Sequence, residues 1–552
     1  MKTCLVLSYT IQFAHTHATA IALLLAFVAA SAAAAVPRRR TYPPGPRGLP
    51  LLGNTFQLPS SKHWLTYQKW AMSHGGVISF TSMGERLVVL NTARAVCDLF
   101  ESRGAIYADR PVATMVGELV GWNKGLGYAR LTPETSNISS VNELYPVHSH
   151  ARFRVLRRLF QDVIGPSACQ LSDHIERLER ARDDLLGRIT EKSHREPNGC
   201  NFSESVRQST SAFILLLTYG YKVPQDSEDD ELVRIVEDAM DGFSRASEPD
   251  AFLVDRWPIL RYAPPWLPGT GFLREASRMH SDREKLYNVP IELAVGKAIP
   301  SMVSSLLAAA SAQTIEQEEE LIKAVGASLY SGSGFRYFEC THRALQTHSA
   351  LMSFLLAMLL YPEVQTRAQV QLDSVLGSLE IARPLSLQDR EHLPYVEALV
   401  KEVWRWNPSV PLGMAHRVTQ DDIYDGMLLE KGTTVYANLW AILHDENIFP
   451  DPFSFSPERY ISADGKLKQI DRMEDPSLIA FGFGRRICPG LHLADGSLFL
   501  YIASLLQFFV VKKALDEAGN ELEPDVDYEG FISQPKPFKC RLVPRLRGVF
   551  AI

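Results

Sequence analysis

One segment near the C-terminal end constrains this chain more than any other. It runs from Phe481 to Gly490 and reads Phe-Gly-Phe-Gly-Arg-Arg-Ile-Cys-Pro-Gly, so that Cys488 stands in a glycine-rich loop two residues after an arginine. Gly484 and Gly490 allow backbone dihedral angles that other residues resist and leave room for a close ligand. Pro489 suits the first turn of a helix, which would place the cysteine at a helix N-terminus, where the macrodipole stabilises a thiolate.

This pattern indicates a single thiolate ligand for a haem iron. A porphyrin already supplies four nitrogens, so the protein needs one strong axial ligand, and a cysteine thiolate favours cleavage of bound dioxygen. Arg486 is placed to meet a haem propionate. An ordinary buried cysteine is the alternative, but the five fixed positions of Phe-x-x-Gly-x-Arg-x-Cys-x-Gly favour the haem ligand.

The segment resembles the haem-binding loop of the cytochrome P-450 family, the haem-thiolate monooxygenases. The resemblance covers nearly all of the chain from Pro43 onward and implies haem b, with Cys488 as the iron ligand and Phe481 beside it. The motifs are most similar to those of filamentous-fungal enzymes of secondary metabolism, of the O-methylsterigmatocystin oxidoreductase type. Residues 257–269 and 535–544 carry this narrower likeness.

Composition limits the other possibilities. The 552 residues are 46% hydrophobic and 22% charged, with a formal net charge of −6, which is ordinary for a globular protein and gives no indication of nucleic-acid binding. The seven cysteines are scattered and form no Cys-x-x-Cys pair, so the sequence predicts neither a disulfide framework nor a zinc site.

The first residues predict a membrane anchor. The stretch from Ala18 to Val36 is almost entirely apolar and would cross about 28 Å of hydrocarbon as a helix. Three arginines at 38–40 follow, and the positive-inside rule then holds the rest of the chain in the cytosol. A cleaved signal peptide is the alternative. The resemblance favours a single-pass anchor and basic flank at 1–40 in the endoplasmic reticulum membrane, with 41–552 as a cytosolic haem-thiolate domain.

Periodicity predicts a mainly α fold with a small β region. Amphipathic helical runs include 174–189, 363–376 and 497–509, whereas 76–92 and 433–435 are extended candidates. The proline-rich segment 255–268 contains Trp257, Tyr262 and Trp266. These rings suit either a membrane interface or packing against the protein's own surface.

Several further residues gain meaning from the resemblance. It implies that Glu402, Arg405 and Arg459 form a buried charge network behind the haem. It also implies that His416 and Arg417 meet one haem propionate. For Arg157, which follows Phe153 where the family has tryptophan, it implies contact with the other propionate. A surface salt bridge is the alternative for each arginine.

The central helix departs from the family pattern. In the family this helix carries an acid and a threonine that relay the protons consumed by the reaction. Here no Asp-Thr or Glu-Thr pair occurs between Ser333 and His348. Thr347 lies near the expected hydroxyl and is the predicted catalytic residue, with Glu339 and Thr341 as possible substitutes.

Two stretches, Leu131–Ser149 and Ser333–His348, are longer than the corresponding joins in the family. They are either translated introns or genuine features of a variant with a remodelled oxygen site. Sequencing of the mature transcript distinguishes these alternatives.

The sequence therefore predicts monooxygenation of a small hydrophobic natural product, such as a terpenoid or polyketide. No Gly-x-Gly-x-x-Gly dinucleotide motif is present, so electrons would come from a separate partner, NADPH–cytochrome P-450 reductase. Two alternatives stay open: a haem-binding protein without monooxygenase activity, and a thiolate-haem isomerase or dehydratase that needs no reductase.

Overall fold

The computed structural model describes residues 41–131, 150–224, 230–248, 251–294, 299–309, 315–331, 346–377 and 383–545. The predicted anchor lies outside these residues, as do Glu339, Thr341 and most of the two long joins. The chain divides into two compact units, Met1–Pro43 with Asp421–Glu430, and Pro44–Gln420 with Lys431–Ile552. The first contains the antiparallel pair β4 (Asp422–Tyr424) and β5 (Met427–Leu429). Everything that follows concerns the second unit.

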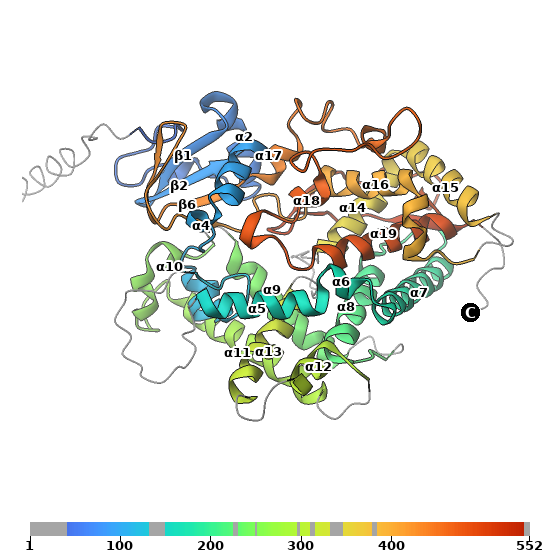
Figure 1. Ribbon diagram of the computed structural model, residues 1–552, viewed down its shortest axis with the longest axis horizontal. Helices are drawn as coiled ribbons and strands as arrows, with labels where there is room; N and C mark the ends of the chain where they lie inside the picture. Colours follow the sequence, from blue (N-terminus) through green and yellow to red (C-terminus); the bar gives the residue numbers. More distant parts are fainter. Residues whose placement is uncertain are drawn as a thin grey trace, which may run out of the picture. The chain divides into compact units, whose positions relative to one another are not determined.

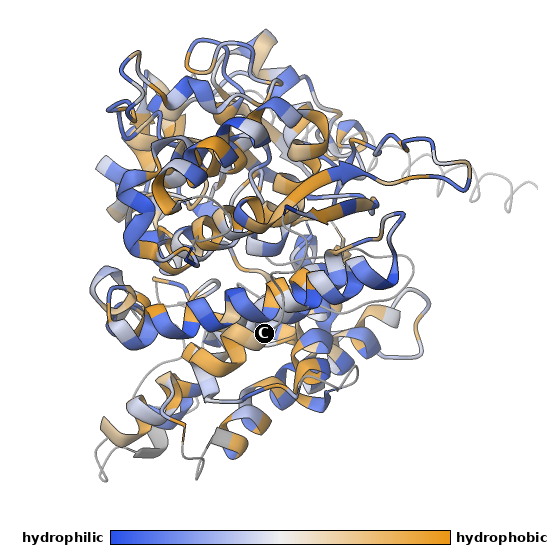
Figure 2. Ribbon diagram, turned by 90° about the vertical axis from the view of Figure 1, so that its right-hand side faces the viewer, coloured by the Kyte–Doolittle hydropathy of each residue, from blue (hydrophilic) through white to orange (hydrophobic). Residues whose placement is uncertain are grey.

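Helices dominate this unit, as the sequence predicts, and Figure 1 shows their order along the chain. Those outside the haem loop are α2 (His63–His74), α3 (Ala93–Val96), α4 (Gly104–Tyr107), α5 (His150–Ile164), α6 (Pro166–Cys169), α7 (Ser172–Arg195), α8 (Ser203–Tyr219), α9 (Glu231–Ser247), α10 (Leu253–Arg256), α11 (Gly271–Ala294), α12 (Met302–Ala309), α13 (Ile315–Ser331), α14 (Gln346–Leu360), α15 (Pro362–Leu376), α16 (Pro394–Trp406), α17 (Leu439–Leu443) and α18 (Pro476–Ile479). The last, α19 (Leu491–Phe508), follows that loop directly. Figure 2 shows hydrophilic and hydrophobic residues alternating along the outer helices, the pattern of helices with one buried face.

A small sheet has the strand order β1-β2-β6-β3. Its strands are β1 (Val77–Ser82), β2 (Glu85–Leu90), β6 (Thr434–Ala437) and β3 (His416–Arg417). The hairpin of β1 and β2 is antiparallel, and β2 pairs in parallel with β6. Two smaller antiparallel pairs join β7 (Phe509–Lys513) to β10 (Cys540–Pro544), and β8 (Tyr528–Glu529) to β9 (Gln534–Pro535). The two predicted extended stretches therefore fall on the sheet, and the prediction of a small β region is confirmed.

One helix of the described residues, α19, is long and apolar enough to cross a membrane. However, 72% of it is buried inside the protein, and it packs against α14, α15 and α16. Its apolar composition is therefore that of a central core helix, and its N-terminus fixes the position of the loop that precedes it.

The charge network on α16 is present. Arg405 donates two hydrogen bonds of 2.8 Å to the carboxylate of Glu402, and both side chains have no solvent exposure. Glu402 also accepts from the Ser456 amide at 2.8 Å and from Arg459 at 3.3 Å. Because a buried carboxylate needs its charge compensated and its lone pairs satisfied, this network fixes α16 to the segment that leads to the haem loop. The predicted network is thus confirmed.

The aromatic residues of the proline-rich segment lie at the surface. Trp266 is 80% exposed, Tyr262 73% and Trp257 44%. These exposures do not favour the alternative in which the rings pack against the protein's own surface.

Candidate active site

The loop before α19 presents Cys488 to a cavity. The Cys488 amide donates to the Phe481 carbonyl at 2.9 Å, which closes the loop, and Gly490 is the N-cap residue of α19. Gly484 has φ +57°, and a Cβ there would lie 2.1 Å from the carbonyl oxygen of Phe100. Only glycine fits this position, because both the backbone conformation and the close contact exclude a side chain. The helix predicted after the cysteine is confirmed, but it begins at Leu491, so Pro489 precedes its first turn instead of lying in it.

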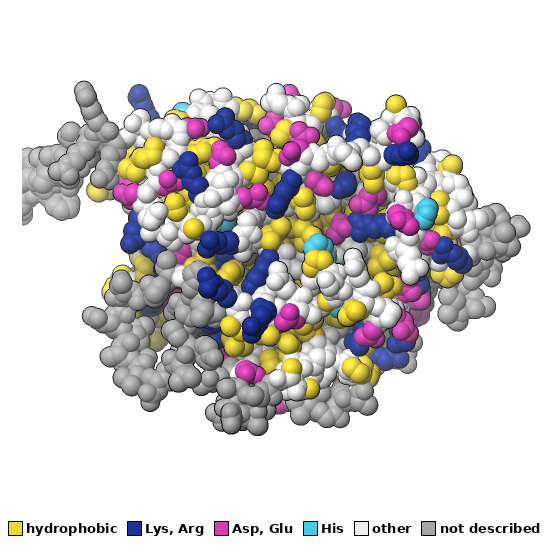
Figure 3. Space-filling view, in the orientation of Figure 1, with side chains coloured by type: hydrophobic (Ala, Val, Ile, Leu, Met, Phe, Trp, Pro, Cys, Tyr) yellow, Lys and Arg dark blue, Asp and Glu magenta, His cyan; other side chains and the backbone are white. Residues whose placement is uncertain are grey.

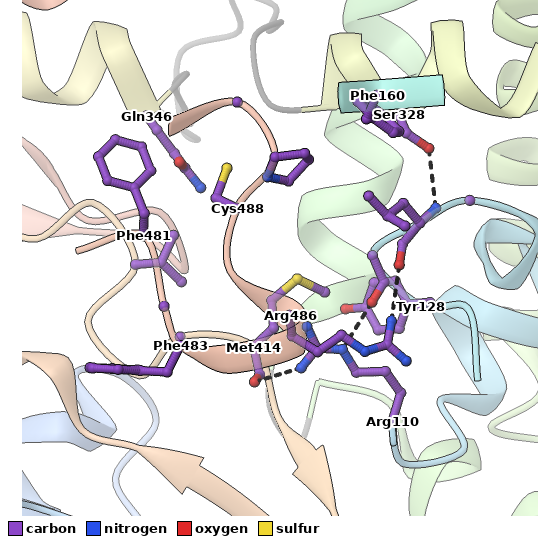
Figure 4. A pocket seen from close by; sticks show the side chains of 18 of the residues that line it. Arg110, Tyr128, Phe160, Ser328, Gln346, Met414, Phe481, Phe483, Arg486 and Cys488 are labelled. Carbon is purple, nitrogen blue, oxygen red and sulfur yellow. Dashed lines mark hydrogen bonds between the residues drawn. The ribbon is translucent and has the colours of Figure 1, made fainter. Parts of the chain in front are cut away.

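The cavity has a volume of about 260 Å³ and an apolar lining with few polar groups. It exceeds the ~150 Å³ of an engineered cavity that holds benzene, so it admits more than one ring. Figure 4 shows Cys488 and Phe481 on one side and Arg110, Arg486 and Tyr128 on another. Phe481 is held by an edge-to-face contact with Trp404, with ring centroids 4.9 Å apart.

Three arginines line the same cavity, Arg110, Arg157 and Arg486. Arg110 donates to the carbonyls of Gly127, Met414 and Ala415 at 2.7 to 3.0 Å. Arg157 donates to the carbonyl of Ile487, the residue before the cysteine. Arg486 donates to three backbone carbonyls, and its guanidinium lies 4.1 Å from the ring centre of Phe153. Phe153 thus supports an arginine, although it lacks an indole N–H donor.

This cluster of cations fits a dianionic ligand. Among the residues that the structure describes, none of the three arginines forms an ion pair with a carboxylate. Burial, and then the neighbouring Arg110, hold the pKa of Arg486 well below its usual range. Burial also lowers the pKa of Arg110 to about 10. Cations that are buried together destabilise one another unless an anion joins them, and the two propionates of a haem supply that charge.

His416 and Arg417 lie differently. His416 lines the cavity, stacks on Phe100 with centroids 3.9 Å apart, and lies 2.8 Å by its Nδ1 from the Tyr107 carbonyl. Burial and the adjacent Arg110 hold the pKa of His416 well below its usual range. Arg417 follows on the same strand, and successive strand residues point to opposite faces. Arg417 is not among the residues that line the cavity.

Cys488 is half-buried, and burial raises the pKa of its thiol. The Gly490 amide and Arg157 act in the opposite direction, because a hydrogen-bond donor and a nearby cation both favour the thiolate. A metal cation would complete this stabilisation, since a coordinating thiol is deprotonated. The donor set therefore fits a haem iron: one sulfur at the cavity wall and cationic groups further along it.

Helix α13 contributes Ser328 and Leu329 to the cavity, and helix α14 contributes Gln346. Ser328 accepts a hydrogen bond of 3.4 Å from the Leu126 amide. Thr347 is half-buried and does not line the cavity. The described lining includes no aspartate or glutamate. The structure thus brings Cys488, Phe481, Arg157, His416 and Arg486 together, and Figure 4 shows Gln346 on the cysteine side.

Sequence reasoning missed Arg110. It lies in the short run Asp-Arg-Pro, which has no spacing relative to Cys488 that could have distinguished it from other arginines. Only its burial, 5% exposed, and its place on the cavity wall identify it.

The mainly helical fold, with one cysteine at the N-terminus of a core helix facing an apolar, cation-lined cavity, defines a haem-thiolate protein. The sequence profile of the family described as Cytochrome P450 matches residues 346–542. The chain belongs to the cytochrome P450 family, which binds haem b through a cysteine thiolate.

The relatives are fungal monooxygenases. Cytochrome P450 monooxygenase 208 of Postia placenta is 40% identical over 92% of this chain and 91% of its own length. Cytochrome P450 monooxygenase claR of Ampulloclitocybe clavipes is 36% identical over 92% of this chain and 87% of its own. Tryptamine 4-monooxygenase of Psilocybe cyanescens is 35% identical over 93% of this chain and 94% of its own. The chain is thus a cytochrome P450 monooxygenase; the narrower likeness to O-methylsterigmatocystin oxidoreductase stays a prediction.

Proposed function

We propose that this chain is a membrane-anchored monooxygenase that oxidises a small hydrophobic natural product with dioxygen and with electrons from NADPH. The observation that carries the proposal is the shared cavity of Cys488 and three arginines, none of which forms an ion pair with a carboxylate among the described residues. When bound, the haem supplies the iron that activates dioxygen. The protein supplies the axial ligand, the anion sites and an apolar enclosure.

Each residue then has a definite task. Cys488 ligates the iron, and the Gly490 amide stabilises its negative charge. Arg157, Arg486 and His416, together with Arg110, hold the propionates and so set the orientation of the porphyrin. Arg417 lies beside this group on β3, and its predicted propionate contact stays a prediction. Thr347 does not line the cavity, and its catalytic role stays a prediction.

The cavity favours an apolar or aromatic substrate. Trp122, Phe243, Leu329 and Val410 contribute apolar surface, while Ser328 and Gln346 are the polar side chains that α13 and α14 bring to the lining. An apolar pocket with a few polar groups binds small organic molecules by shape and by one or two hydrogen bonds. This lining supports a terpenoid or polyketide-like substrate.

A surface of positive charge supports docking of a reductase. Arg154, Arg158 and Arg485 are exposed on α5 and on the haem loop. Figure 3 shows lysine and arginine side chains gathered over α5. A cationic surface around the thiolate attracts an acidic partner and orients it for docking on the haem side. NADPH–cytochrome P-450 reductase is the proposed partner.

Membrane association is proposed on two grounds. The apolar stretch 18–36 with its basic flank is the proposed anchor, at the endoplasmic reticulum membrane, with the domain 41–552 in the cytosol. The exposed rings of Trp257, Tyr262 and Trp266 suit the headgroup region, where tryptophan and tyrosine are enriched.

One observation favours a second candidate function. Because the described lining contains no carboxylic acid, a thiolate-haem isomerase, which needs no imported protons, is the alternative. The test is turnover of the full chain in microsomes with the reductase and a panel of terpenoids and polyketides. Substrate-dependent NADPH consumption that yields an oxygenated product supports monooxygenation. Product formed at the same rate without NADPH supports the isomerase.

A further inference from the structure

Three buried side chains beside the cavity carry hydrogen-bond donors that no described residue accepts. They are Nε1 of Trp122, Oη of Tyr287, and the Nε and Nη1 atoms of Arg283. The three residues are only 1% to 3% exposed. We name these residues the donor cluster. Because an unpaired buried donor is costly, several of them in one place indicate a partner that comes from outside the chain.

The donor cluster forms where helix α11 meets the turn η4 (Trp122–Lys124). Arg283 and Tyr287 lie one helical turn apart on α11, and the guanidinium carbon of Arg283 is 4.5 Å from the centre of the Tyr287 ring. Trp122 meets the same ring edge-on, with centroids 6.4 Å apart. Gly121 has φ +94°, and a Cβ there would lie 3.1 Å from three atoms of the Arg283 guanidinium. Glycine therefore allows α11 to bring its arginine against the turn.

The donor cluster borders the cavity that contains Cys488. Trp122 itself lines this cavity, and so does Gly125. A Cβ on Gly125 would lie 3.7 Å from Oη of Tyr287 and 2.8 Å from Oγ of Ser328, another lining residue. Because Gly125 has no side chain, the phenol lies directly behind the cavity wall. Figure 4 shows Ser328 and Cys488 apart from each other, so the cluster borders a part of the cavity separate from the thiol.

The charges around the donor cluster favour an anion. Arg283 donates a hydrogen bond to Glu284, whose side chain is 43% exposed, so water screens this ion pair and compensates the buried guanidinium only in part. Arg152 is also buried and donates to the Lys124 carbonyl at 3.2 Å. Lys124 pairs at 3.9 Å with Glu320, which is exposed as well. Two buried guanidinium groups therefore face the turn, and both nearby carboxylates lie toward solvent.

We propose that the donor cluster binds a carboxylate of the substrate, which is therefore an apolar acid. The proposal rests on the function proposed above and specifies the class of its substrate. Trp122 and Tyr287 donate to the carboxylate oxygens, and Arg283 supplies the compensating charge. Burial raises the pKa of Tyr287, so the phenol keeps the proton that it donates. With the acid group held at this place, its distance along the skeleton selects the carbon that is oxidised.

Fatty acids that carry a terminal imidazole test this subsite without turnover. The imidazole ligates the haem iron and shifts the Soret absorption, while the chain carries the carboxylate toward the donor cluster. Dissociation constants are measured on the full-length holoenzyme for acids of six to twelve carbons, for 1-alkylimidazoles of the same lengths and for the methyl esters. At one length or more, we expect the acid to bind at least about tenfold more tightly than the alkylimidazole, because hydrogen bonds to a charged group are strong.

Two conservative variants connect this preference to the donor cluster. Trp122→Phe and Tyr287→Phe each remove one donor and keep an aromatic ring, and each should reduce the preference for the acid about threefold to tenfold. Tyr501→Phe is the matched control, because Tyr501 on α19 is also a buried phenol without a hydrogen-bond partner among the described residues and does not line the cavity. The preference is a ratio within one variant, so general damage to the cavity cancels.

The outcomes separate this inference from the proposed function. Equal binding of acid and alkylimidazole by the wild-type protein at every length overturns the subsite, as does a preference that both variants retain in full. A methyl ester that binds as tightly as the acid overturns the assignment of a charged group. A holoenzyme that prefers the acid but oxidises nothing with NADPH and the reductase fails the proposed function and supports this inference.

Discussion

Glu402 and Arg405 face each other one helical turn apart on α16, joined by two hydrogen bonds of 2.8 Å, and neither side chain is exposed to solvent. The Arg405 guanidinium also donates hydrogen bonds to the carbonyls of Leu443, Pro452 and Ser454. One ion pair therefore anchors the long irregular segment that connects α17 to the haem loop. The pair matters for stability because removal of one partner leaves the other charge buried without its counter-charge.

Glu402→Gln is expected to destabilise the protein by about 3–5 kcal/mol, because it leaves the buried guanidinium of Arg405 without its counter-charge. Urea unfolding followed by circular dichroism measures this loss. The control is Glu191→Gln, which breaks the exposed pair of Glu191 and Arg195 on α7. That pair should contribute no more than about 1 kcal/mol. Equal losses in the two variants would contradict the role given to Glu402.

Arg486→Leu should lower the haem content of the purified protein at least fivefold, because it removes one cation that faces a propionate. Arg485→Leu provides a matched control, since the Arg485 side chain is exposed and does not line the cavity. The pyridine haemochrome assay gives the ratio of haem to protein. Full haem content in Arg486→Leu would show that the cluster does not hold the porphyrin.

His444 gives the fold a pH dependence. It is stacked on Trp440 with centroids 3.8 Å apart, and burial followed by the nearby Arg405 lowers its pKa from 6.5 to about 3. The unfolded chain therefore binds a proton that the folded chain rejects, and stability falls as the pH drops from 6.5 toward 3. Between pH 7 and pH 5 this group should remove about 2 kcal/mol.

The comparison of wild type with His444→Gln isolates this contribution. Their difference in unfolding free energy should shrink by about 2 kcal/mol from pH 7 to pH 5, as measured by urea titration at each pH. A difference that stays constant would mean that the pKa of His444 is the same in the folded and the unfolded protein.

The exposed rings of the loop after α10 should lie in lipid headgroups. In vesicles with brominated phospholipid, quenching of tryptophan fluorescence should fall clearly when Trp257 and Trp266 are both changed to Phe. Trp404→Phe serves as the control, because Trp404 is buried on α16 and only 1% exposed. Identical quenching in wild type and the double variant would place the loop in water.

The sequence predicts the haem loop well, because it is a short pattern whose spacing is dictated by local geometry, whereas the charge network is predicted only through the family resemblance. Cys488 must follow a tight glycine turn and precede a helix, and Glu402 must lie one turn from Arg405. Arg110 is different. It joins the cavity through contacts to Met414 and Ala415, some three hundred residues away, and no local pattern records such a contact.

Two other features depend on details that a sequence pattern does not fix. His416 and Arg417 are adjacent, yet strand alternation gives only His416 to the cavity. Gln346 and Thr347 are adjacent at the start of α14, and successive helix residues differ by about 100° in direction, so Gln346 lines the cavity and Thr347 does not. The role of α19 is likewise not fixed by its sequence pattern, since hydropathy alone cannot distinguish a core helix from a membrane-spanning helix.

The most direct test is the reduced carbon-monoxide difference spectrum of the 552-residue chain expressed in microsomes. We expect a Soret band at the position of thiolate-ligated haem, and we expect its loss in Cys488→Ser. A wild-type band at the position of nitrogen-ligated haem, or none at all, would contradict the assignment of Cys488. If a band then appears only in a chain without Leu131–Ser149 and Ser333–His348, those stretches are not part of the working enzyme.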